Sequence, residues 1–241
     1  MNSIQDALPS TSKSPPQIYN FKRPHRHRFS LPYQVIEFMI KNCKSAKVWK
    51  KLITSCKFFY PKHPILPVKC LNLWFGMQCD ADGEIFDSSK SFPKFWVYDS
   101  FASSFSNVSI VIRNVFKFDL RFLRMRAQRL TFDEYKHLTS SGSIKEIYLE
   151  SCTIQNADGT VVTIDKLVEN LQLLEKFEMR GIRATFDFAS LIDFLLKNKT
   201  VSFIFAYRGP ISDAYKQNVA NVLREIKKDL SLKYPRIEFH P

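Results

Sequence analysis

Apolar side chains recur every three or four residues in two short stretches near the start of the chain. In the first stretch, which follows Leu31 and Pro32, these positions are Val35, Ile36, Met39 and Ile40. In the second they are Val48, Trp49, Leu52, Ile53 and Cys56, with Lys47, Lys50 and Lys51 between them. Such spacing places the apolar residues on one face of an α-helix, so each stretch is predicted to be an amphipathic helix.

Prolines follow the second helical stretch, at positions 61, 64 and 67. Proline lacks a backbone N–H group and does not continue a helix. The helical pair is therefore predicted to form a separate module over residues 29–67, with a second domain over residues 68–241.

After residue 68 the pattern changes to short runs of alternating apolar residues, which are typical of strands. The runs are KCLNLWF, KFWVYDS, VSIVIRN, FLRMRAQ, KEIYLESC, EKFEMRG, VSFIFAY and IEFH. Helical spacing appears between the later runs, in TFDEYKHLTSS, TIDKLVENLQLL, FDFASLIDFLLKN and DAYKQNVANVLREIKKDL. The first of these segments has Thr131 and Glu134 at the spacing of a capping box. The C-terminal domain is therefore predicted to be α/β, built from irregular repeats of strand, loop and helix.

The interval between strands resembles that of a repeat protein. The first residues expected to point inward from four successive strands are Ile147, Phe177, Phe203 and Ile237, at intervals of 30, 26 and 34 residues. Leucine-rich repeats have periods of roughly 20–29 residues. The segment IKEIYLESCTIQ also follows the L-x-x-L-x-L-x-x-C-x-L order of that repeat. We predict a leucine-rich-repeat-like sheet with helices on one face, and an ordinary α/β sheet is the alternative.

The net charge of +13 is concentrated in the first third of the chain. Through Cys70 there are 13 Lys and Arg residues against Asp6 and Glu37, whereas the remainder has 23 against 21. A basic region favours an anionic partner, such as nucleic acid, an acidic protein surface or a membrane face. Residues 1–28 are rich in Ser, Pro and Gln and lack apolar periodicity, so they are predicted to be a disordered basic tail.

Residue types that carry catalysis or bind metals form no recognisable pattern. The five cysteines include no CxxC pair and follow no secretory signal, which indicates reduced thiols in a cytoplasmic or nuclear protein. The histidines are scattered, and the turn at CDADGEIF lacks later ligands of a calcium loop. No apolar run reaches the ~20 residues of a membrane span. We expect no enzymatic activity, no cofactor, no metal and no membrane crossing.

Strand parity predicts which residues share the outer face of the sheet. In FLRMR, inward Leu123 and Met125 direct the two arginines to the opposite face. By the same reasoning, the outer face is expected to carry Trp74, Trp96, Tyr98, Arg113, Arg124, Arg126, Tyr148 and Arg180, together with Glu150 and Glu178. Arg, Trp and Tyr are enriched at interface hot spots, which makes this face a candidate substrate-binding surface. A solvated face with ordinary cross-strand charge pairs is the alternative.

The N-terminal helical stretch resembles an F-box, a short module that opens with Leu-Pro and ends in a Cys-Lys-aromatic run. Leu31-Pro32 and SCKFFY are the two ends of this resemblance, and SAKVWKKLITSCKFFYPKHPIL is similar to the divergent F-box-like modules of the nematode-type families. The resemblance implies that the chain docks a Skp-type linker protein. The residues that match the family's pattern there are Leu31, Pro32, Val35, Ile36, Met39, Trp49, Leu52 and Cys56.

The resemblance further implies a substrate-recognition adaptor of a cullin-RING ubiquitin ligase of the SCF type, with an unknown protein as its substrate. Two other functions remain open. One is nucleic-acid binding by the basic tail and the second helix, with Trp74, Trp96 and Arg124 available for stacking; it predicts a steep dependence of affinity on salt. The other is a protein-interaction role in which the F-box-like module has lost its partner.

Overall fold

The structure is a computed structural model that describes residues 31–74, 78–87, 90, 93–104, 108–182, 195, 198–228 and 233–240. The tail expected at residues 1–28 lies outside these ranges, as does most of the helix expected in FDFASLIDFLLKN. Within them, the chain is an α/β protein with seven helices and a mixed central sheet, which confirms the predicted fold class at this level.

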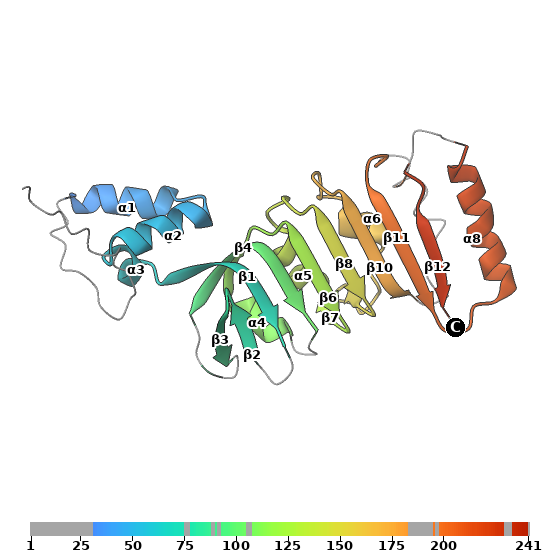
Figure 1. Cartoon of the computed structure of the whole chain (residues 1–241), viewed down its shortest axis with the longest axis horizontal. Helices are drawn as coiled ribbons and strands as arrows, with labels where there is room; N and C mark the ends of the chain where they lie inside the picture. The colour runs from blue at the N-terminus through green and yellow to red at the C-terminus, as the bar shows by residue number, and fades with distance from the viewer. Residues whose placement is uncertain are drawn as a thin grey trace, which may run out of the picture.

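The elements lie along an elongated molecule, with three helices at one end (Figure 1). These are α1 (Tyr33–Asn42), α2 (Ala46–Ser55) and α3 (Phe59–Lys62). A ten-stranded sheet has the order β12-β11-β10-β8-β6-β4-β1-β2-β3, with β5 paired to β4. Its strands are β1 (Ile65–Leu73), β2 (Gln78–Ala81), β3 (Glu84–Asp87), β4 (Lys94–Ser103), β5 (Val115–Phe118), β6 (Phe122–Arg126), β8 (Glu146–Glu150), β10 (Lys176–Ile182), β11 (Ser202–Arg208) and β12 (Arg236–His240). A separate two-stranded sheet pairs β7 (Arg129–Thr131) with β9 (Thr153–Gln155).

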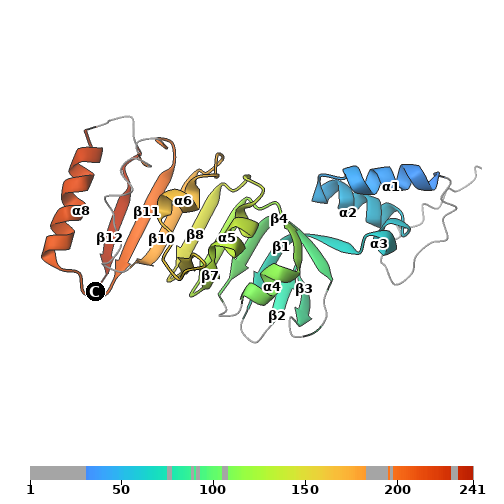
Figure 2. The ribbon, with the colours of Figure 1, turned by 180° about the vertical axis from the view of Figure 1, so that it is seen from behind.

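Parallel pairing runs from β1 through β4, β6, β8, β10 and β11 to β12, whereas β1, β2 and β3 pair antiparallel. Four further helices lie on one face of this sheet (Figures 1 and 2). They are α4 (Val108–Asn114), α5 (Phe132–Thr139), α6 (Ile164–Val168) and α8 (Asp213–Ile226). This arrangement leaves the opposite face of the strands without a helix over most of its described length.

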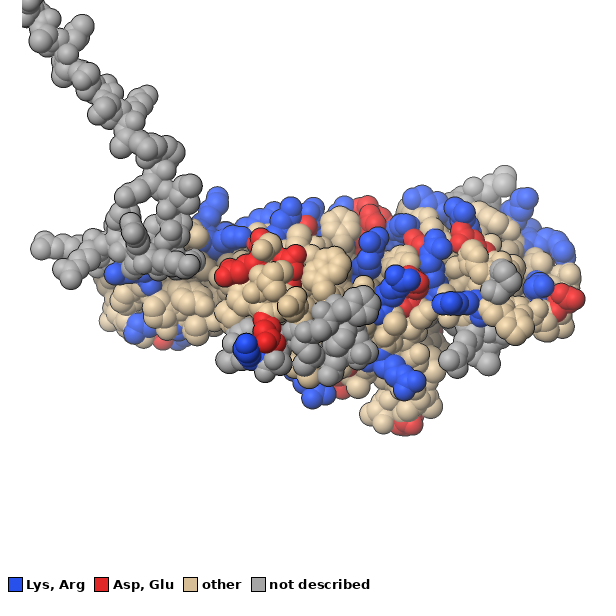
Figure 3. Space-filling model, turned by 60° about the horizontal axis from the view of Figure 1, so that its bottom comes forward, with Lys and Arg blue, Asp and Glu red and all other residues tan. Residues whose placement is uncertain are grey.

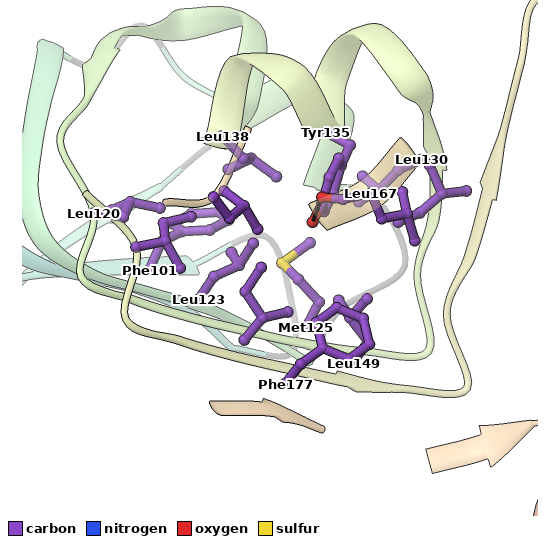
Figure 4. Close-up of a cluster of buried hydrophobic side chains, with 14 of the residues drawn as sticks. Phe101, Leu120, Leu123, Met125, Leu130, Tyr135, Leu138, Leu149, Leu167 and Phe177 are labelled. Atoms are coloured by element: carbon purple, nitrogen blue, oxygen red, sulfur yellow. Dashed lines mark hydrogen bonds between the residues drawn. The ribbon is translucent and has the colours of Figure 1, made fainter. Parts of the chain in front are cut away.

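One hydrophobic core joins these helices to the inward side chains of the strands. Met125, Leu149 and Phe177 point from successive strands toward Tyr135 of α5 and Leu167 of α6 (Figure 4). The Tyr135 hydroxyl donates a hydrogen bond to the Leu167 carbonyl oxygen at 2.8 Å, so the two helices are also linked by a buried polar contact. Burial raises the pKa of the Tyr135 phenol, which stays neutral in this core.

The neighbouring strands β6, β8 and β10 repeat the same backbone turn at paired positions. Arg126, Glu150 and Arg180 pair in register, and the residues that follow them, Ala127, Ser151 and Gly181, all have positive φ, at 52°, 52° and 69°. The backbone N–H of Ala127 donates to Glu150 and that of Ser151 donates to Arg180, each at 2.8 Å. The parallel ladder therefore continues through a turn that recurs from strand to strand.

The inward residues used to estimate the repeat interval lie at two levels of the sheet. Ile147, Phe177 and Phe203 are paired in register, as predicted. Ile237 instead pairs with Phe205, two residues further along. The predicted intervals of 30 and 26 residues therefore hold, whereas the interval of 34 joins residues at different levels.

Seven of the predicted strands are confirmed, as β1, β4, β6, β8, β10, β11 and β12. The prediction of a strand in VSIVIRN was wrong, because this segment forms α4. Its buried residues Val108, Val111 and Ile112, followed by Val115, have helical spacing, and Ile110 is exposed. The alternation of Val108, Ile110 and Ile112 is also compatible with a strand, and such short apolar runs do not separate the two structures.

Among the predicted helices, α5 has the expected capping box, in which Thr131 and Glu134 each accept a backbone N–H of the other. The helix predicted in TIDKLVENLQLL is shorter than expected and ends at Val168. β1 already begins at Ile65, ahead of Pro67, so one strand crosses the boundary expected between residues 67 and 68.

Candidate functional site

The three N-terminal helices form a small module with its own hydrophobic cluster. Buried members of this cluster are Ile36, Ala46, Trp49, Ile53, Cys56, Phe59, Ile65 and Trp96. The last two come from β1 and β4, so the module is completed by the sheet. The indole N–H of Trp49 donates to the carbonyl oxygen of Ile65 at 2.8 Å, which fixes α2 to the start of β1.

This cluster separates the predicted linker-binding residues into two groups. Ile36, Trp49 and Cys56 are buried in the module, which corrects the expectation that they contact a partner directly. Leu31, Pro32 and Val35 are exposed, and Met39 and Leu52 are half-buried.

An apolar surface lies on the outer side of α1. We call it the outer α1 face and define it by Leu31, Val35 and Phe38, which expose 43%, 40% and 67% of their surface. At 3.6 residues per turn, Val35 and Phe38 lie roughly opposite Tyr33 and Ile40 on the helix. Phe38 was missed in the sequence, although its distance of three residues from Val35 follows the helical period, and Leu31 lies just before the helix.

The helical module is rich in lysine. Residues 31–64 contain seven lysines, at positions 41, 44, 47, 50, 51, 57 and 62, against the single acid Glu37. Lys41 pairs with Glu37 at 3.0 Å on α1, and Lys50 pairs with Asp82 at 3.0 Å. The module therefore has a net positive charge, as expected from the first third of the sequence.

The Lys50–Asp82 pair also joins α2 to the turn between β2 and β3. The Asp82 carboxylate accepts the backbone N–H groups of Lys69 and Cys70, both at 2.8 Å. Burial alone would raise the pKa of Asp82, but these two N–H groups and Lys50 outweigh it and lower that pKa. Gly83 has φ of 89°, and its N–H donates to Asp80, so the predicted polar turn is confirmed.

The predicted substrate-face residues do not form one surface. Trp96 is buried and Tyr98 half-buried, because the helical module covers this end of the sheet. Arg113 lies on α4, on the helical side of the sheet, where it approaches Glu134 at 3.8 Å. Its predicted place on the outer face was wrong, because the prediction assumed a strand. Trp74 is exposed just after β1.

The remaining predicted residues share the outer face of β6, β8 and β10, and they contact one another. The Arg124 guanidinium lies 5.1 Å from the centre of the Tyr148 ring, whose hydroxyl donates to Glu150 at 2.7 Å. Arg126 pairs with Glu150 at 3.1 Å, and Arg180 pairs with both Glu178 and Glu238. Arg124 makes no ion pair with the described acids.

These contacts balance the charge of the outer sheet face. Burial would raise the pKa of Glu178, but hydrogen bonds from Lys176 and Arg180 lower it, so this carboxylate stays charged. On the face shown in Figure 3, basic and acidic side chains are interspersed. The cross-strand charge pairs considered from the sequence are present among the described residues of the outer sheet face.

The described residues include no group of three His, Cys, Asp or Glu side chains placed to hold a metal ion. All five cysteines are free, and burial raises the pKa of the Cys152 thiol to about 11. None of the helices in the described ranges has the length and apolarity needed to cross a membrane.

Comparisons of this chain with protein-family models, with curated proteins and with solved structures found no match.

Proposed function

We propose that this chain is a substrate-recognition adaptor of a cullin-RING ubiquitin ligase of the SCF type. In this proposal, the helical module docks a Skp-type linker through the outer α1 face, and the outer face of the sheet binds a target protein. The observation that carries the proposal is the outer α1 face, where three large apolar side chains are exposed although α1 already buries Ile36 on another side.

Burial against a partner would offset the cost of exposing these side chains. Fully burying a side chain such as that of Phe38 is worth roughly 1.5–3 kcal/mol. The net positive charge of the module would attract an acidic linker and raise the association rate more than the affinity. An apolar centre with a charged rim is the usual anatomy of a protein interface.

The C-terminal domain supports the second half of the proposal. Its parallel strands, its helices on one face and its repeated turn at Ala127, Ser151 and Gly181 favour a leucine-rich-repeat-like domain. Such domains bind partners on an extended face of the sheet. Arg124 and Tyr148 are the residues we expect to contact a target, because they lie on that face and Arg124 has no acidic partner among the described residues.

The adaptor proposal is tested by binding to a purified Skp-type linker. The wild-type chain should bind with saturation, and Leu31→Ala combined with Phe38→Ala should weaken binding at least about tenfold, since two large apolar contacts are removed. Both side chains are exposed, so these changes should leave the circular dichroism spectrum and the unfolding temperature unchanged.

The matched control is Val161→Ala combined with Leu173→Ala, which removes exposed apolar side chains elsewhere on the molecule. This control should bind the linker like the wild type. Equal binding by the Leu31/Phe38 variant and the control would show that the outer α1 face is not the docking surface.

A further inference from the structure

A pocket of about 520 Å³ lies where the helical module meets the sheet. We call it the junction pocket. One wall is the inner side of α1, with Tyr33 and Ile40, and the opposite wall is formed by Phe116 and Lys117 at β5. Its volume is within the range of about 300–1,000 Å³ that holds a compact ligand or a few side chains.

Aromatic rings form a continuous lining inside the pocket. Trp49 contacts His63 edge to face, with ring centres 5.5 Å apart, and His63 contacts Phe116 in the same way at 5.5 Å. Phe116 in turn lies 6.1 Å from Trp96. The rings leave Phe116 46% exposed.

The polar atoms of both tryptophans are already engaged. The Trp49 N–H donates to the Ile65 carbonyl oxygen, and the Trp96 N–H donates to the Asp119 carboxylate at 2.6 Å. Trp49 and Trp96 are only 1% and 4% exposed, so the carbon surface open to an occupant belongs mainly to Phe116 and Tyr33, which are 46% and 56% exposed. The lining suits a large apolar or aromatic side chain.

Lysines surround this aromatic lining. Lys41, Lys44, Lys62 and Lys117 contribute to the pocket walls, against the single acid Glu37. Lys41 pairs with Glu37, and Lys117 pairs with Asp119 just outside the lining. Lys44 makes no ion pair with any described residue. The pocket is thus apolar within and positively charged at its walls, and an occupant that complements it is apolar at its centre and acidic around it.

The chain's own N-terminal segment does not match this chemistry. Residues 1–30 contain five Lys and Arg residues and one acid, Asp6, so their charge has the same sign as the pocket walls. The lysines come from α1, from the segment after it, from α3 and from β5. A ligand that meets several of them needs carboxylates on more than one side of its apolar group, which an extended acidic peptide provides.

We propose that the junction pocket binds an acidic peptide segment of a partner protein, with one large apolar side chain packed against Tyr33 and Phe116 and flanking carboxylates on the lysines. The outer α1 face lies on the opposite side of the same helix, so both surfaces can be occupied together. This inference goes beyond the adaptor proposal and stands without it.

The test measures fluorescence anisotropy of a labelled peptide of about ten residues, in which one Phe is flanked on both sides by Asp and Glu, added to the full chain. We expect saturable binding in the micromolar range. Replacing the peptide's Phe by Ala should weaken binding about tenfold, and so should replacing its acids by Asn and Gln, because each change removes one of the two complementary features.

On the protein, Lys44→Glu combined with Lys62→Glu should weaken binding at least about tenfold. The control is Lys47→Glu combined with Lys57→Glu, which makes the same change in net charge at exposed lysines outside the pocket. This control should weaken peptide binding less than about threefold. Phe116→Ala is a second variant that leaves every lysine in place and should also weaken binding about tenfold.

Three results would overturn the proposal. One is the absence of saturable binding by the wild type up to about 1 mM peptide. Another is an equal loss of peptide affinity in the Lys44/Lys62 variant and the Lys47/Lys57 variant, which would show a general charge effect. The third is tighter binding of an oligothymidylate of similar charge than of the peptide, which would assign the basic pocket to nucleic acid. Since the linker is absent from this assay, its outcome is independent of the adaptor test.

Discussion

Gly181 shows how a single residue is fixed by the repeated turn in the sheet. Its φ is 69°, and a Cβ atom added there would lie 2.5 Å from the Oγ of Ser151 and 3.2 Å from the Ser151 backbone nitrogen. Backbone strain and close contact with the neighbouring strand therefore act together. Gly159 also has positive φ, at 82°, but a Cβ there would meet nothing within 4 Å.

This difference predicts unequal costs for the same substitution. Gly181→Ala should lower the free energy of unfolding by about 2–4 kcal/mol, because it adds overpacking to the backbone penalty. Gly159→Ala should cost only about 1 kcal/mol, from the backbone penalty alone. Urea denaturation of both variants measures the difference, and equal losses would contradict the close contact with Ser151.

Asp82 provides a pH-dependent contribution at the joint between α2 and the sheet. Its pKa is lowered in the folded chain, so it stabilises the folded state above its unfolded pKa of about 4, and this contribution is lost as the pH falls through the folded value. Asp82→Asn should therefore destabilise the chain at pH 7, by less than about 1 kcal/mol because the pair with Lys50 is partly exposed.

The effect of Asp82→Asn should disappear at low pH. We expect the difference in unfolding free energy between wild type and variant to shrink steadily below pH 4 in urea titrations. Asp133→Asn is the control, since that carboxylate is 86% exposed in its pair with Lys136. A difference for Asp82→Asn that stays constant from pH 7 to pH 2.5 would contradict the role of its charge.

Among the individual elements, strands were predicted best where apolar residues alternate with polar residues along the chain. In β6 and β8, apolar Leu123, Met125, Ile147 and Leu149 alternate with Arg, Glu and Tyr, and only the strand period fits. VSIVIRN lacks such polar alternation, which is why it was misassigned. The strands β2, β3 and β5 were missed because each of them has only four residues.

The helical assignment of α4 predicts a contrast between adjacent residues. Val111→Asp should destabilise the chain by more than about 3 kcal/mol, because it places an unpaired carboxylate in the core. Ile110→Asp should cost less than about 1 kcal/mol, since Ile110 faces solvent. Thermal unfolding of the two variants decides between helix and strand, because a strand at this position would bury Ile110 with Val108 and Ile112.

The candidate site was only partly predictable for a related reason. Helical spacing showed that α1 and α2 are apolar on one side, but it does not distinguish residues of the module's own core from residues left for a partner. Ile36 and Trp49 share their buried cluster with Ile65 and Trp96 of the sheet, which is a long-range contact. The junction pocket depends on the same contact and has no signature in any short segment.

In the molecule as a whole, the helical module and the sheet share a hydrophobic cluster. The module contains fewer than about 40 residues, which is near the lower limit for independent folding. Its cluster includes Trp96 from the interior of β4, and Lys50 is paired with Asp82 of the hairpin. The expected boundary at residue 67 therefore lies within one packed unit.

A peptide of residues 29–67 alone should lack a cooperative thermal transition, because it lacks Trp96 and Asp82. Circular dichroism on heating measures this directly. The same segment within the full chain should melt together with the sheet. A cooperative transition of the isolated peptide at a temperature like that of the full chain would contradict the shared cluster.

We propose that the outer α1 face docks a Skp-type linker. Light scattering during size-exclusion chromatography of the chain mixed with the purified linker tests this proposal, because it measures the mass of any complex. We predict a single species with the summed mass of one copy of each protein. Two separate peaks at the masses of the individual proteins, at concentrations of tens of micromolar, would contradict the claim.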